Sequence, residues 1–156
     1  MSASREIQIC NAIAAELNNP TNGFSSSFAA AKHWLEVYQA TDLANLQVSV
    51  TPWRLRRERL TRGNGGSSST NQLDYTIQVD MQKLVNMATL ESDCDALSAI
   101  AEQVFDFYSD AHYLAGLTNY QVMEVAREDI CEANRLYDQP LWESYIEMVV
   151  RVYVAT

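Results

Sequence analysis

Alternating apolar and polar residues predict a long β-hairpin in the middle of the chain. Every second side chain is apolar over residues 46–50, and beyond Pro52 the apolar positions shift by one place. Proline has no N–H to donate to a strand ladder, so a β-bulge at Pro52 explains the shift. A Gly- and Ser-rich turn follows, and then a second alternating run over residues 73–81. We therefore expect two antiparallel strands that form a projecting hairpin arm over residues 46–81.

Two segments have the spacing of amphipathic helices. Residues 4–19 carry apolar side chains at every fourth position, which makes one apolar stripe. Residues 91–116 have a broader apolar face. There Ser92 begins a sequence that fits a capping box, and Gly116 is the expected end of the helix.

Three further strands are expected, over residues 24–34, 119–130 and 141–156, and a helical turn is expected near Thr41. The expected fold class is α+β. It comprises an antiparallel-rich (mixed) β-sheet of about five strands with the hairpin arm, packed by two α-helices on one face. The length of 156 residues suits a single domain, residues 1–156.

Composition narrows the class of protein. Hydrophobic residues make up 47% and charged residues 20%, which is typical of a globular chain. No apolar run approaches the roughly 18 residues of a membrane span, and the polar start is unlike a signal peptide, so we expect the cytoplasm and no membrane. The three cysteines, Cys10, Cys94 and Cys131, are expected to be small buried side chains outside any disulfide framework.

Motifs that carry chemistry are missing from the sequence. His33 and His112 lie far apart and outside any metal-ligand spacing, and the "GNGG" stretch lacks the GK[ST] ending of a phosphate loop. No nucleophile motif is found. We therefore expect no enzyme, with no catalytic, cofactor-binding or metal-binding residues.

Positive charge is concentrated in the hairpin. The chain has 11 Lys+Arg against 20 Asp+Glu and a net charge of −9. Because residues 51–62 alone carry a net charge of +4, the rest of the chain carries −13. The candidate interface residues for a subunit or partner are the tryptophan and the five arginines of this segment: Trp53, Arg54, Arg56, Arg57, Arg59 and Arg62.

Three interpretations of these arginines remain open. They form a solvated edge that charge protects from aggregation, or they contact the acidic surface of an adjacent subunit, or they bind nucleic-acid phosphates. As strand residues, Arg54 and Arg56 share one face, and Arg57 and Arg59 share the other. An acidic body repels a nucleic-acid backbone, and Trp53 alone does not make a stacking platform.

The order of elements resembles a known family. The stretches "VYQATDLANLQVSVTPW" and "ESYIEMVVRVYV", together with the long hairpin and one strong helix between them, look like the tail terminator or head–tail joining (neck) proteins of tailed bacteriophages. The resemblance covers nearly the whole chain as an order of elements, and its motifs are short.

The resemblance implies a structural virion protein. Such proteins form a hexameric ring at the head-proximal end of the tail, terminate the tail tube and join it to the neck. Their partners are further copies of the same chain, the tail tube protein and neck proteins, and genomic DNA passes through the lumen without sequence-specific binding. The implied location is the virion, after assembly in the host cytoplasm. A head-completion adaptor or stopper of the same neck is the alternative within this class.

Overall fold

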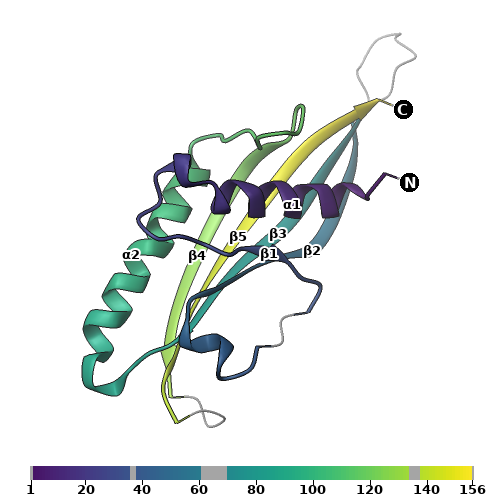
Figure 1. Ribbon diagram of the computed structural model, residues 1–156. Coiled ribbons are helices and arrows are strands. Elements are labelled where there is room, and N and C mark those ends of the chain that lie inside the picture. Colours follow the sequence, from purple (N-terminus) through teal and green to yellow (C-terminus); the bar gives the residue numbers. More distant parts are fainter. Residues whose placement is uncertain (1, 36–37, 61–69, 134–137, 156) are drawn as a thin grey trace.

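The structure, a computed structural model, describes residues 2–35, 38–60, 70–133 and 138–155. It contains one five-stranded sheet with strand order β1-β2-β3-β5-β4. The helices are α1 (Arg5–Asn18) and α2 (Leu90–Ser109), and the strands are β1 (Ala31–Lys32), β2 (Gln47–Leu60), β3 (Thr70–Leu84), β4 (Gln121–Glu132) and β5 (Leu141–Ala155). Both helices lie on one face of the sheet (Figure 1). β1 is parallel to β2 and the other pairs are antiparallel, which confirms the expected α+β class.

The hydrophobic core lies between the helices and this face of the sheet. Ile77, Val79 and Met81 of β3 are fully buried, and so is Ile146 of the adjacent strand β5. The apolar stripe predicted for the first helix packs against them, with Ile13 also fully buried. Burial of side chains of this size contributes roughly 1.5–3 kcal/mol each, so the core fixes which face of every strand points inward.

The predicted hairpin is confirmed. β2 pairs antiparallel with β3, and their register shifts between Pro52 and Arg54, which confirms the bulge. However, β3 also pairs with β5 along its whole length, from Thr70 to Leu84. The upper end of the hairpin is therefore part of a three-stranded sheet, and this corrects the expectation of a projecting two-stranded arm.

The strand expected over residues 24–34 is largely wrong, because only β1 within it is a strand. The side-chain amide of Asn18 makes two hydrogen bonds to the backbone of Ala30. Its oxygen accepts from the Ala30 N–H at 2.7 Å, and its nitrogen donates to the Ala30 carbonyl at 2.9 Å. Phe24 and Phe28 pack against the core with their rings 5.3 Å apart. A side chain of α1 thus holds this segment, and backbone ladder bonds begin only at β1.

The second helix ends earlier than expected, at Ser109 and not near Gly116. The chain turns there through Ala111 and Asn119, which have positive φ angles of 45° and 65°. The expected capping box is also wrong: Ser92 lies inside the first turn, where its hydroxyl donates to the Thr89 carbonyl at 3.0 Å. The connection that follows the helix carries part of a polar network described below.

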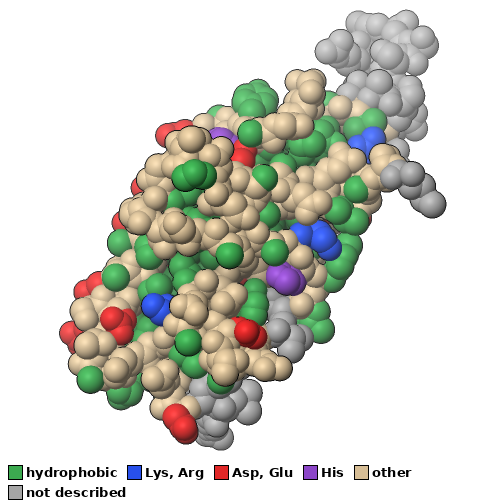
Figure 2. All heavy atoms as spheres, viewed as in Figure 1, with side chains coloured by type: hydrophobic (Ala, Val, Ile, Leu, Met, Phe, Trp, Pro, Cys, Tyr) green, Lys and Arg blue, Asp and Glu red, His purple; other side chains and the backbone are tan. Residues whose placement is uncertain are grey.

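The face of the sheet opposite the helices, called the open face below, is polar. Neither α1 nor α2 lies on it, and some of its short side chains, such as Ser49 and Thr76, are buried. Figure 2 shows the other, helix-bearing face, where Lys and Arg side chains are few and scattered. The strand registers place Arg54, Arg56 and Arg151 on the open face.

Candidate functional site

Over most of the outer edge of β2, no strand that the structure describes is paired with it. β1 pairs with β2 only at Ser49 and Val50, and the His33 N–H donates to the Val50 carbonyl at 3.0 Å. From Thr51 to Leu60, no strand in the described part of the chain pairs with this side of β2. Unpaired N–H and C=O groups on a strand edge can bind another strand. This segment, called the β2 edge below, is therefore the candidate binding site.

Exposed apolar side chains gather at the β-bulge of this edge. Trp53 is 61% exposed, Leu55 55% and Trp34 60%. Together with Pro52 and Ile77 they line a recess of about 170 Å³. Pockets for small molecules usually measure about 300–1,000 Å³, so the recess suits a protein side chain better than a ligand. Tryptophan often dominates the binding energy of protein interfaces.

Two of the predicted arginines complete this surface. Arg54 and Arg56 are exposed and lie opposite Thr76 and Asp74 of β3. Neither forms an ion pair with another described residue. An exposed guanidinium beside an apolar recess combines the two kinds of side chain that are enriched at interfaces.

The other three arginines are only partly described. Arg57 and Arg59 lie opposite Leu73 and Asn71, so their register assigns them to the opposite face from Arg54, as the strand period predicted. Their side chains lie outside the described part of the structure, and so does the whole of Arg62. The prediction that these three bind a partner therefore stays a prediction.

Asp74 is already engaged by a different arginine. Arg151 of β5 donates from Nε to Oδ1 at 2.8 Å and from Nη2 to Oδ2 at 3.0 Å. The hydrogen bond from Arg151 lowers the pKa of Asp74, and the charge of Arg56 lowers it a little further. Because Arg151 occupies both carboxylate oxygens, the charge of the neighbouring Arg56 remains available to a partner.

This ion pair predicts a pH dependence of stability. The folded-state pKa of Asp74 lies below its unfolded value of about 3.9, so the pair stabilises the fold above that pH and stops doing so as pH falls through the folded pKa. Replacing Asp74 by asparagine should lower the free energy of unfolding by about 1 kcal/mol at neutral pH. Urea unfolding measured from neutral to acidic pH should show the two proteins converging in acid. A difference that stays constant with pH would contradict the assignment.

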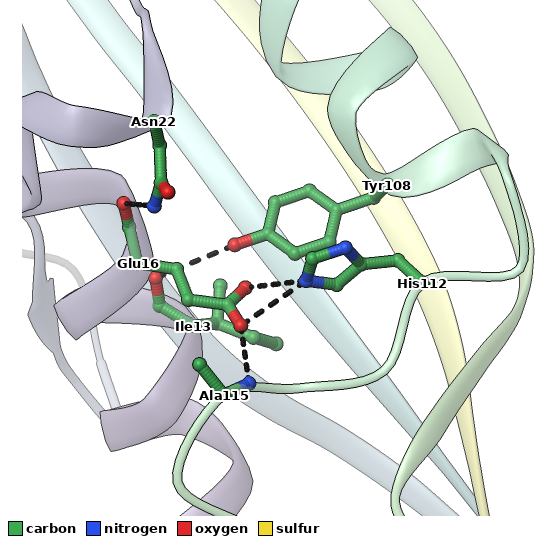
Figure 3. A network of polar contacts seen from close by, with 6 residues as sticks. All are labelled: Ile13, Glu16, Asn22, Tyr108, His112 and Ala115. Carbon is green, nitrogen blue, oxygen red and sulfur yellow. Dashed lines mark hydrogen bonds and ion pairs between the residues drawn. The ribbon is translucent and has the colours of Figure 1, made fainter.

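A second polar cluster lies between α1 and the α2–β4 connection (Figure 3). The Glu16 carboxylate is 4% exposed, and its two oxygens lie 3.0 and 3.1 Å from His112 Nε2. It also accepts a hydrogen bond from the Ala115 N–H. Burial, followed by the nearby Glu16 charge, raises the pKa of Tyr108, whose hydroxyl lies 3.5 Å from the Ile13 carbonyl.

This cluster connects two parts of the fold that are far apart in the chain. His112 Nε2 is occupied by the carboxylate, and the imidazole ring packs between Phe107 and Tyr108 at centroid distances of 4.6 and 5.2 Å. The interaction joins α1 to a connection 96 residues later in the chain. Sequence analysis missed it, since neither residue belongs to a recognisable motif.

Of the three cysteines expected to be buried, Cys94 and Cys131 differ from the expectation and Cys10 confirms it. Cys10 is buried, and burial raises its pKa to about 12. Cys131 is exposed and Cys94 half-buried, and their sulfur atoms lie 3.1 Å apart without a bond between them. α2 and β4 bring these two thiols together, which their separation of 37 residues did not indicate.

Other kinds of site find no support in the described ranges. They contain no group of three or more His, Cys, Asp or Glu side chains that could hold a metal ion. None of the helices described is long and apolar enough to span a membrane.

The sequence matches no protein-family model, and a search of curated proteins finds no match. The geometry of the β2 edge is therefore the main guide to function.

Proposed function

We propose that this chain is a structural assembly protein whose β2 edge binds another copy of the chain. One observation carries the proposal: a ten-residue strand edge, Thr51–Leu60, with which no described strand pairs on the outer side, presents Trp53, Arg54 and Leu55. An added strand would gain backbone hydrogen bonds, and the aromatic and arginine side chains would supply specificity. The rest of the chain, outside residues 51–62, has a net charge of −13, so another copy of the chain is a suitable acidic partner.

We further propose, on the resemblance described above, that the assembly is a ring in the neck of a tailed bacteriophage. It would terminate the tail tube at its head-proximal end and join it to the neck, with DNA passing through the lumen. The α+β fold with helices on one face agrees with that family, and the absence of a catalytic motif in the sequence suits a structural role. An adaptor or stopper of the same neck is the alternative.

Charge reversal at the β2 edge tests the proposal. The variant R54E/R56E should self-associate at least about 100-fold more weakly than the wild type, because like charges at an interface cost several kcal/mol. Both side chains are exposed, so the variant should stay folded by circular dichroism. The matched control R54K/R56K keeps the charges and should retain most of the assembly. Light scattering that gives the same oligomer mass for R54E/R56E and wild type would contradict the proposal.

The nucleic-acid interpretation makes a different prediction. If the arginines bind phosphates, duplex DNA should bind with steep salt dependence, at roughly one unit of log–log slope per phosphate contact. R54E/R56E would then lose DNA binding and leave the oligomer mass unchanged. We expect the reverse: loss of assembly, with no DNA binding by the wild type at about 50 mM salt.

A further inference from the structure

The opposite edge of the sheet, formed by β4, is likewise without a neighbouring strand among the described residues over most of its length. At its start, β4 is covered on its outer side, where the Val122 N–H donates to the His112 carbonyl at 2.8 Å and Gln121 bridges to Tyr113. From Met123 to Glu132, no strand in the described part of the chain pairs with this side. This segment, called the β4 edge below, has ten residues, as the β2 edge does.

The two edges carry opposite charge on the same face of the sheet. Glu124, Glu128 and Glu132 of β4 lie opposite open-face residues of β5 and are exposed. Arg54 and Arg56 of β2 belong to the same open face and are also exposed. None of these five side chains forms an ion pair with another described residue. The sheet is thus basic along one edge and acidic along the other.

Strand direction allows the two edges to meet. β2, β3, β5 and β4 follow one another across the sheet in antiparallel pairs, so β4 runs opposite to β2. When a second copy is placed beside the first with its strands in the same directions, its β4 is antiparallel to β2 of the first. The open faces of the two copies are then continuous, and a shift along the strand direction brings glutamates of one copy beside arginines of the other.

Pairing between two identical edges is disfavoured. Two β2 edges would bring Arg54 and Arg56 of one copy close to the same arginines of the other, and two β4 edges would bring glutamates together. Like charges on facing strands are destabilising. A head-to-tail contact, β4 edge to β2 edge, avoids this and leaves one free edge of each kind for the next subunit, which allows a ring to close.

We propose that the β4 edge, Met123–Glu132, of one subunit pairs antiparallel with the β2 edge, Thr51–Leu60, of the next, which makes one continuous sheet across the contact. This inference rests on the self-assembly proposed above and names the surface that receives the β2 edge.

Complementary charge reversals test the pairing. E124R/E128R should be monomeric under conditions where the wild type assembles, and so should R54E/R56E. Mixed in equal amounts, the two variants should assemble again, because every contact between unlike subunits then joins opposite charges. Recovery of at least about half of the wild-type oligomer mass is expected, with subunits alternating around the assembly.

The control E102R/D106R makes the same change of net charge on an exposed part of α2, and it should assemble like the wild type. The outcomes separate the two proposals. If R54E/R56E is monomeric and E124R/E128R still assembles, the β2 edge binds some other surface, and only the present inference is overturned. If the wild type is itself a monomer, both proposals fail. Two monomeric variants that do not assemble when mixed would also overturn the edge pairing.

Discussion

Replacement of His112 by alanine should lower the free energy of unfolding by about 3 kcal/mol, because it leaves a buried carboxylate without its main partner. Glu16 is 4% exposed, and without the imidazole it would keep the hydrogen bond from the Ala115 N–H and the interaction with the Tyr108 hydroxyl. Burying a charge without a partner costs several kcal/mol. Urea unfolding monitored by circular dichroism at neutral pH measures the change.

A double variant tests whether the unpaired charge causes the loss. E16Q/H112A removes the charge and keeps an amide oxygen that can accept from the Ala115 N–H. It should therefore be more stable than H112A alone, by about 1 kcal/mol or more. If the double variant is less stable than H112A, the loss reflects packing of the ring against Phe107 and Tyr108, and the electrostatic explanation is wrong.

Oxidation of the Cys94–Cys131 pair should raise the free energy of unfolding by up to about 4 kcal/mol. The sulfur atoms are 3.1 Å apart and need to approach by only about 1 Å to reach disulfide bond length. The bond would close a loop between residues 37 positions apart and reduce the entropy of the unfolded chain. It would also fix the N-terminal half of α2 to β4.

Oxidised glutathione is a suitable reagent for this test. Exchange converts the two thiols to a disulfide and reduces one glutathione disulfide to two thiols. Burial, with the neighbouring Cys131, raises the pKa of Cys94 to about 12, so attack by the Cys94 thiolate should be slow at neutral pH and faster in alkaline buffer. The matched control C131S should show no stabilisation. Equal unfolding midpoints for the reduced and oxidised wild type would contradict the prediction.

Local patterns predicted most of the elements. The alternation around Pro52 predicted both the hairpin and its bulge, since strand period and proline chemistry act within a few residues. The same period assigned Arg54 and Arg56 to one face. The sequence did not show that β3 lies between β2 and β5, because periodicity carries no information on strand order. The embedding of the hairpin in the sheet was missed for this reason.

The other misses have a common physical cause. Glu16 and His112 are 96 residues apart, and Cys94 and Cys131 are 37 apart, so only the tertiary fold brings each pair together. The segment over residues 24–34 alternates like a strand, yet the Asn18 side chain binds its backbone at Ala30. The sequence also did not indicate that Trp34 belongs to the candidate site. Trp34 and Trp53 line the same recess beside α1, and only the tertiary fold brings them together there.

The most direct test of the account is the mass of the wild-type protein in solution. Sedimentation equilibrium should be recorded from about 1 μM to about 1 mM, a range that covers weak and moderate self-association. If the β2 edge binds another copy head to tail, the average mass should rise with concentration beyond that of a dimer and fall when salt is added. A mass that stays at that of one 156-residue chain over the whole range would contradict self-assembly through this edge.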